Sequence, residues 1–192
     1  MRSIMMFLAI ALFATVAMGD VITEKKSKTD FPATITLPGA DGPVELNALG
    51  TGLRKKAIIK VYAGCFYVEA GANLGEDPAT AAINGDFAKQ IDMYFLRDVG
   101  GGKIGGAFRD GIHKTLEGHD ENVDAFCDLF SAEIKKGESI VLSFLPGLGL
   151  SASQAGKELG LLEDADVIAA LWATWFGDKP IAKDLKEGML GL

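Results

Sequence analysis

The sequence predicts an α+β protein in which one antiparallel sheet is covered by a layer of helices. Strand-like segments come first, helical segments gather in the middle, a strand-like hairpin follows, and helices close the chain. Single strands and single helices do not alternate, so the parallel sheet of a βαβ protein is not expected. The length of 192 residues suits one domain behind an N-terminal leader.

The first 19 residues have the layout of a secretory signal peptide. Arg2 gives a positive start, an apolar run follows from Ile4 to Val16, and Ala17 and Gly19 supply the small residues of a cleavage site. The run is too short for a comfortable membrane span, which needs about 20 residues. We expect cleavage after Gly19, a periplasmic or secreted protein, and no transmembrane segment after the leader. An uncleaved N-terminal anchor is the alternative.

Composition narrows the function classes. The chain carries 19 basic and 26 acidic side chains, for a net charge of −7. An acidic chain is poorly suited to nucleic acid, because binding to phosphates requires a basic surface. Cys65 and Cys127 both lie in apolar patterns, which favours two buried thiols over a disulfide.

Motifs for cofactors and metals are weak. The glycines of residues 147–152 follow a strand but precede another strand, not the helix that a dinucleotide site requires. Gly100–Lys103 lacks the spacing of a phosphate loop, and His113 and His119 are not the i, i+4 pair of a zinc protease. We therefore expect no cofactor and no metal.

The first half of the chain is predicted to be mostly strands. Residues 20–32 are charged and irregular and are expected to form a flexible segment ahead of a domain at residues 33–192. The expected elements are strands at 34–37 and 44–49, a long strand at 50–69 with a break at Gly64, a short helix capped by Asp77, and a strand at 89–97.

The second half carries the helical patterns. Apolar residues recur every four positions from Ile104 to Leu116, and the spacing from Val123 to Ile134 is that of an amphipathic helix. A strand at 139–145 and a hairpin-like return at 150–162 come next. Asp164 or Asp166 is then expected to cap a helix that Gly177 ends, and Pro180 to open the last short helix.

Residues 50–63 have an unusual charge pattern. In one regular strand, alternate residues share a face. One face would then be mostly apolar, and the other would be a cationic row made of Arg54, Lys56, Ile58, Lys60 and Tyr62. An ordinary solvated face with extended lysine side chains is the alternative.

This region and several later motifs resemble the chalcone isomerase superfamily, above all bacterial chalcone isomerase-like proteins and the related fatty-acid-binding branch. The resemblance covers nearly all of residues 33–192 and implies an open-faced β-sandwich with a ligand cleft between sheet and helices. The motifs are Gly-Thr-Gly-Leu-Arg-Lys-Lys at 50–56 and the segments 60–68, 94–99, 144–147, 172–180 and 184–186.

The resemblance carries over only part of the isomerase site. In plant chalcone isomerases the arginine that matches Arg54 binds the phenolate nucleophile. The threonine of the first strand pair matches Tyr62, the tyrosine before Arg-Asp matches Leu96, and a Ser or Thr on the C-terminal helix matches Ile168. Because preorganised polar donors supply much of such catalysis, we expect negligible chalcone cyclisation.

The fatty-acid-binding branch uses the same arginine together with a tyrosine that matches Tyr62, and the pair holds a carboxylate. Eight strand steps separate the two positions here and span roughly 26 Å at about 3.3 Å each. Both side chains could reach one carboxylate only across a bend, bulge or turn; otherwise Tyr62 is not the partner of Arg54.

Three functions follow from the sequence. The first is an exported protein that binds a small amphipathic carboxylate in an apolar cleft, with Arg54, Tyr62, Leu96 and Ile168 as ligand-binding residues. The second is an isomerase or intramolecular lyase on an unknown substrate, with Arg54 as its catalytic group. The third is an interaction scaffold without a ligand, in which Arg54 forms a structural ion pair.

Overall fold

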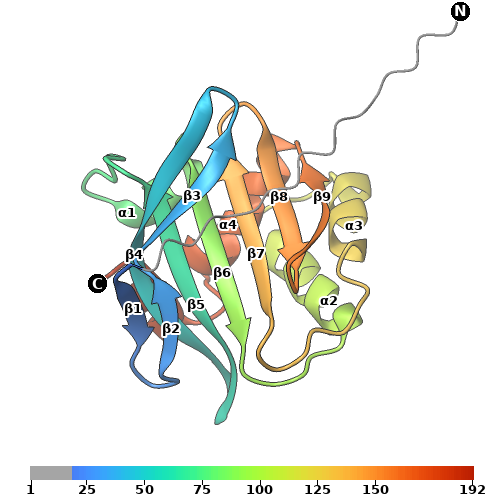
Figure 1. The fold of residues 1–192 in the computed structure, drawn as a ribbon. Helices are drawn as coiled ribbons and strands as arrows, with labels where there is room; N and C mark the ends of the chain where they lie inside the picture. Colours follow the sequence, from blue (N-terminus) through green and yellow to red (C-terminus); the bar gives the residue numbers. More distant parts are fainter. Residues whose placement is uncertain (1–18) are drawn as a thin grey trace, which may run out of the picture.

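The computed structural model describes residues 19–192, so most of the predicted signal peptide lies outside the described residues. The described chain forms a curled seven-stranded antiparallel sheet with a helical layer on one side (Figure 1). The sheet strands, which follow one another in space as in sequence, are β3 (Thr34–Gly39), β4 (Gly42–Lys56), β5 (Ile59–Glu69), β6 (Lys89–Phe95), β7 (Ser139–Leu145), β8 (Gly149–Gln154) and β9 (Lys157–Leu162).

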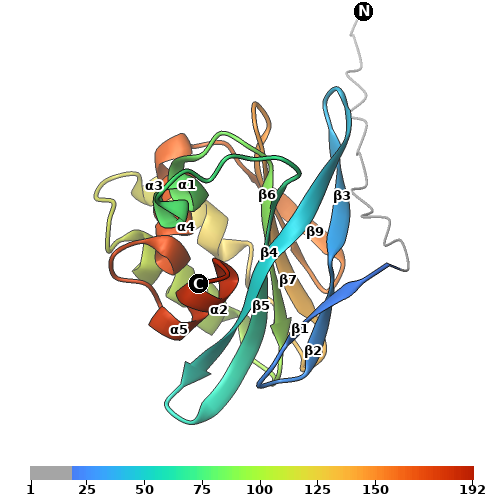
Figure 2. The ribbon, with the colours of Figure 1, turned by 90° about the vertical axis from the view of Figure 1, so that its left-hand side faces the viewer.

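Helices gather on the inner side of the sheet, as the view in Figure 2 shows. Their apolar faces and the inner sheet face form the main core, which includes Phe66, Trp172 and Phe176. The predicted α+β class is therefore confirmed. The helices of the described chain are α1 (Pro78–Asn84), α2 (Gly101–Ile112), α3 (Asp120–Asp128), α4 (Ala165–Phe176) and α5 (Lys183–Met189).

Helix caps follow the sequence signals closely. The Asp77 side chain accepts hydrogen bonds from the first turn of α1, and the Asp164 side chain does the same for α4, which Gly177 ends. Several boundaries differ from the prediction; α2, for example, ends at Ile112 and does not reach Leu116. Helix α3 stops at Asp128, and Ile134 instead forms an isolated bridge with Val99; α5 begins at Lys183 and not at Pro180. No described helix is both long and apolar enough to cross a membrane.

The prediction of an irregular segment at residues 20–32 is wrong. Strands β1 (Val21–Glu24) and β2 (Thr29–Pro32) form an antiparallel hairpin. The Glu24 carboxylate closes its turn by accepting hydrogen bonds from the backbone N–H groups of Lys26 and Ser27. The buried Phe31 then packs into a second apolar cluster, on the outer face of the sheet. The buried Phe31 and the hydrogen bonds to Glu24 therefore stabilise a hairpin in a segment whose many charges predicted irregular structure.

The predicted single strand at residues 50–69 is also wrong. The chain reverses at Ala57 and Ile58, so β4 and β5 form a hairpin, and the expected break at Gly64 does not occur. Gly64 pairs with Gly52 in regular register. A Cβ atom on Gly52 would lie 2.7 Å from the Leu185 carbonyl oxygen, so this glycine allows α5 to pack closely on the sheet.

The two cysteines lie on opposite faces of the sheet. Cys65 belongs to the outer apolar cluster and Cys127 to the main core, and both are buried free thiols. Burial raises the pKa of each thiol, to about 12 for Cys65 and about 11 for Cys127, so neither is a reactive thiolate at neutral pH.

The carboxyl group of Asp92, on the outer face of the sheet, makes the stability of the fold depend on pH. It lies opposite Cys65 on β6, its Oδ1 atom has no hydrogen-bond partner among the described residues, and burial raises its pKa to about 6 despite the nearby Ser139 hydroxyl. The unfolded-state value is about 3.9. The folded state therefore binds the proton more tightly, and stability falls as pH rises from about 4 to 6 and stays lower above that range.

Asp92→Asn should remove the loss of stability that ionisation of Asp92 causes as the pH rises. We expect the free energy of unfolding to increase by about 1–3 kcal/mol at pH 7.5 and to change little at pH 4. Denaturant unfolding at the two pH values measures both quantities. An equal effect of the substitution at both pH values would contradict the assignment.

Candidate functional site

A cavity of about 390 Å³ lies between the sheet and the helical layer, at the end of the β4–β5 hairpin. Its walls come from β4, β5, β6, α2 and α4. Most of the lining is apolar and includes Met93, Phe95, Ile104, Phe108 and Trp175. Because ligand sites usually combine an apolar concave surface with a few polar groups, this cavity is the first candidate for a binding site.

Arg54 and Tyr62 meet across the hairpin. They are direct partners in the β4–β5 register, so their side chains lie on the same face. The next pair is Lys55 with Lys60, which leaves Val61 as an extra residue in β5 and forms a β-bulge. The turn and the bulge provide the chain reversal that the eight-residue spacing requires. Both side chains line the cavity.

The Tyr62 phenol is oriented by Trp175. The indole Nε1–H donates a hydrogen bond to the phenol oxygen at 3.0 Å, and the side chain is buried. Burial raises the Tyr62 pKa to about 12, against the smaller lowering effects of this hydrogen bond and of the Arg54 charge. The phenol is therefore neutral at physiological pH. Since its oxygen already accepts from Trp175, its own proton can be donated to a ligand acceptor in the cavity.

Arg54 supplies a half-buried positive charge at the cavity wall. Its guanidinium donates to the backbone carbonyl of Lys55. Within residues 19–192, no carboxylate lies within ion-pair distance of Arg54. The ion pair of Arg54 that the scaffold hypothesis requires is thus not found among the described residues.

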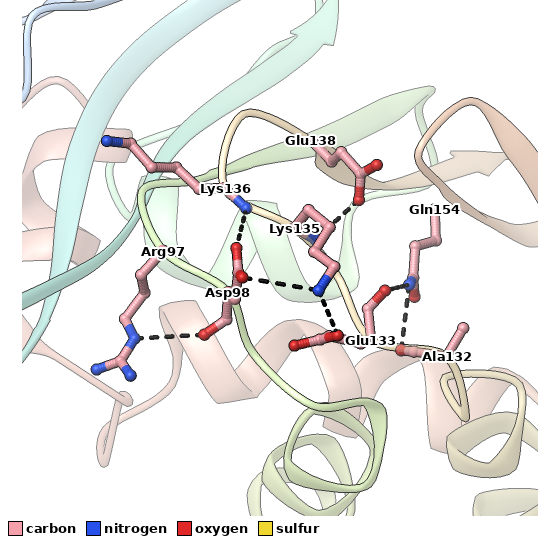
Figure 3. A network of polar contacts seen from close by, with 8 residues as sticks. All are labelled: Arg97, Asp98, Ala132, Glu133, Lys135, Lys136, Glu138 and Gln154. Atoms are coloured by element: carbon pink, nitrogen blue, oxygen red, sulfur yellow. Dashed lines mark hydrogen bonds and ion pairs between the residues drawn. The ribbon is translucent and has the colours of Figure 1, made fainter.

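Asp98 is the one carboxylate among the cavity-lining residues, and it is already engaged (Figure 3). Its Oδ1 accepts a hydrogen bond from the Lys136 backbone N–H at 2.8 Å, and its Oδ2 lies 3.7 Å from the Lys135 ammonium. The Lys136 hydrogen bond and the Lys135 charge lower the Asp98 pKa. Asp98 is therefore ionised and neutralised at the rim, not poised to donate a proton.

Two predicted ligand-binding residues lie elsewhere. Phe95 pairs with Tyr62 and faces the cavity, so the neighbouring Leu96 is not among its lining residues. Ile168 lines a second cavity, between α1, α4 and the β7–β8 turn. The structure thus brings Arg54 and Tyr62 together but separates Leu96 and Ile168 from them.

The second cavity contains Lys89, whose exposed fraction is only 1%. Its ammonium donates to the carbonyl oxygens of Ile83 and Gly85 at the C-terminal end of α1. It also lies 5.1–5.4 Å from the ring centres of Phe87, Phe144 and Trp172. Burial lowers its pKa to about 8. A cation at a helix C-terminus, surrounded by aromatic faces, accounts for Lys89 as a structural cap of α1.

A third polar group joins two helix starts. His119, Asp164 and Asp166 have side-chain ligand atoms within 4.8 Å of one another. The Asp164 carboxylate, however, already accepts from His119, from Asn122 and from the first turn of α4. The His119 hydrogen bond, with the others, lowers the Asp164 pKa to about 2. Capping of α4 accounts for this group.

The comparisons with known proteins identify the family. A model of the chalcone isomerase-like family matches residues 23–191. This chain belongs to that family. The match begins inside the β1–β2 hairpin, so the chalcone isomerase-like domain starts before residue 33, the boundary that the sequence predicts.

A solved structure of the same fold is a fatty-acid binding protein of Arabidopsis thaliana. It matches with a TM-score of 0.72 and 23% sequence identity, over 89% of this chain and 96% of that one. At this identity the match shows that the chalcone isomerase-like fold is shared. No curated protein sequence matches the chain.

The sequence did not assign Trp175, Phe95 or Phe108 to a site. Trp175 lies in a stretch that resembles the family, but the bond from its indole to Tyr62 joins residues 113 positions apart. Phe95 differs from the predicted Leu96 by one position, which in a strand means the opposite face. Phe108 belongs to the helical apolar pattern, where core and cavity residues look alike.

Lys89→Met tests the structural role of the buried lysine. Methionine keeps the apolar stem but leaves the carbonyl oxygens of Ile83 and Gly85 without this donor. We expect the free energy of unfolding to fall by about 1–3 kcal/mol, measured by denaturant unfolding. The exposed Lys157→Met is the matched control and should change stability little. Unchanged stability of Lys89→Met would show that α1 does not need the ammonium.

Proposed function

We propose that this chalcone isomerase-like protein binds the carboxylate of an amphipathic, fatty-acid-like ligand in the cavity at the β4–β5 hairpin. Arg54 is the anion anchor, and Tyr62 is the hydrogen-bond donor beside it. The observation that carries the proposal is the cross-strand pairing of these two residues in the wall of a cavity whose lining is mostly apolar. The shared fold with a fatty-acid binding protein supports it.

The chemistry of the pair suits a carboxylate. A carboxylate that leaves water loses its hydration, and it enters an apolar cavity only if charged or polar donors replace that hydration. The Arg54 guanidinium offers two parallel N–H groups that match the two carboxylate oxygens. The neutral phenol of Tyr62 donates a third hydrogen bond, while the alkyl chain lies against residues such as Met93 and Phe108.

Two titratable groups of the cavity, Tyr62 and Asp98, favour binding over catalysis. An isomerase or lyase needs an acid or base whose pKa lies near the working pH. The Tyr62 pKa is raised to about 12, and the pKa of Asp98 is lowered. Neither group exchanges a proton readily at neutral pH. The open cavity, in turn, favours a ligand over the scaffold hypothesis.

Substitutions of Arg54 test the proposal. Arg54→Ala should weaken the binding of a long-chain fatty acid about ten- to hundredfold, because a charge-assisted hydrogen bond contributes roughly 1.5–3 kcal/mol. Arg54→Lys keeps the charge without the bidentate geometry and should fall between wild type and Arg54→Ala. Isothermal titration calorimetry measures all three affinities.

Arg109→Ala is the matched control, since Arg109 pairs with Asp124 and Asp128 away from the cavity. It should bind the fatty acid like wild type. Equal affinity in wild type, Arg54→Lys and Arg54→Ala, with a lower melting temperature only for Arg54→Ala, would assign Arg54 a structural role instead.

We also propose that the protein is exported and acts in the periplasm or outside the cell, on the pattern of residues 1–19. The intact mass of the protein purified from its own compartment should correspond to a chain that begins at Asp20. A chain that begins at Met1 and stays with the membrane would mean that the leader is an anchor.

A further inference from the structure

The β4–β5 hairpin projects beyond the sheet and ends in an exposed apolar tip. Past the Arg54–Tyr62 pair, the described β4 strand pairs only with β5, because β3 pairs with the other end of β4. Figure 2 shows the hairpin extending past the neighbouring strands below the helical layer. Ile58 at its turn is 93% exposed and Ile59 is 48% exposed. Two large aliphatic side chains at a protruding tip require a physical explanation.

Lysines surround this tip. The chain carries no acidic residue from Leu46 to Val68, although the whole protein is acidic. The hairpin contributes Lys55, Lys56 and Lys60, and the β1–β2 turn contributes Lys25, Lys26 and Lys28. We call these six lysines the basic end. The two turns touch, because the Lys60 ammonium donates to the Lys26 carbonyl oxygen.

Most of this charge has no partner within the described residues. Lys26 lies 3.9 Å from Asp184, with both side chains exposed, and it is the one lysine of the basic end with an ion pair there. Lys55 and Lys60 are direct cross-strand partners. Like charges placed opposite each other destabilise an antiparallel pair. An anionic partner would relieve that repulsion.

The basic end shares an exposed lysine, Lys56, with the lining of the cavity. The register places Lys56 and Ile59 on the same face as Arg54 and Tyr62, and all four line the cavity. Lys55 and Lys60 lie on the opposite face of the hairpin. A surface that held the hairpin tip would therefore also lie close to the part of the cavity wall that Lys56 and Ile59 form.

We propose that the basic end and Ile58 dock the protein onto an anionic lipid surface, with the cavity opening facing the lipid. An aliphatic tip among lysines matches a membrane interface, where apolar side chains enter between headgroups and lysines contact anionic phosphates. Nucleic acid would satisfy the lysines but leave Ile58 in water. Docking and carboxylate binding are tested separately, because fatty-acid binding is measured without vesicles.

Vesicle sedimentation tests the docking. The probes are vesicles of phosphatidylglycerol and phosphatidylcholine in about equal parts, and vesicles of phosphatidylcholine alone. The exported protein should partition onto the anionic vesicles at least about tenfold more strongly, and high salt should weaken that binding. All variants carry the same N-terminus as wild type, so any effect of the leader cancels.

Hairpin variants locate the contact. Lys55→Glu should weaken binding to the anionic vesicles at least about fivefold, and Ile58→Asp at least about tenfold. The matched controls Lys114→Glu and Leu161→Asp make equivalent changes of charge and polarity at exposed positions outside the basic end and should bind like wild type. Neither Lys55 nor Ile58 lines the cavity, so both hairpin variants should keep the fatty-acid affinity of wild type.

Tryptophan fluorescence at the hairpin tip provides a second measurement of docking. Both native tryptophans are buried, so in Ile58→Trp the new indole reports on the tip itself. Its fluorescence should shift to the blue on addition of anionic vesicles and not on addition of phosphatidylcholine. The proposal is overturned if wild type does not bind anionic vesicles, if it binds both vesicle types equally, or if Lys55→Glu and Ile58→Asp bind like wild type.

Discussion

The pairing of Arg54 with Tyr62 across the β4–β5 hairpin organises the candidate binding site of this protein. The reversal at Ala57 and Ile58 brings two residues that are eight positions apart onto one face, and the bulge at Val61 adjusts the register between them. The same hairpin wall then continues to the exposed tip. A change in this register by one residue would turn Tyr62 away from the cavity and leave Arg54 without its neighbour.

Helix α4 completes the site from the opposite layer. Trp175 donates to the Tyr62 oxygen, so this hydrogen bond joins helix to sheet and leaves the phenol proton available to a ligand acceptor. Arg54 and Tyr62 lie beside apolar lining residues such as Met93 and Phe108, which suits a ligand with one charged end and one alkyl end. Lys89, the buried cation of the second cavity, serves a different purpose, because two carbonyl oxygens and three aromatic rings already surround it.

Local signals predicted most of the fold. The caps at Asp77 and Asp164 and the order of strands and helices follow from short-range chemistry, and the structure confirms them. The turn at Ala57 was not visible, because it contains no Gly, Pro, Asn or Asp even though Ala57 has a φ of 53°. The placement of Phe95 in the cavity instead of Leu96 depends on cross-strand register, and the Trp175 contact depends on tertiary packing. Neither is encoded locally.

The charge state of a bound carboxylate tests the central claim most directly. A fatty acid labelled with ¹³C at its carboxyl carbon can be titrated by NMR while bound to the protein. With Arg54 and Tyr62 as donors, the pKa of the bound carboxyl should lie below its value in water, because both donors stabilise the charged form. The pKa should rise in the Arg54→Ala variant. A bound carboxyl whose pKa is raised in wild type, as burial alone would cause, would contradict the account.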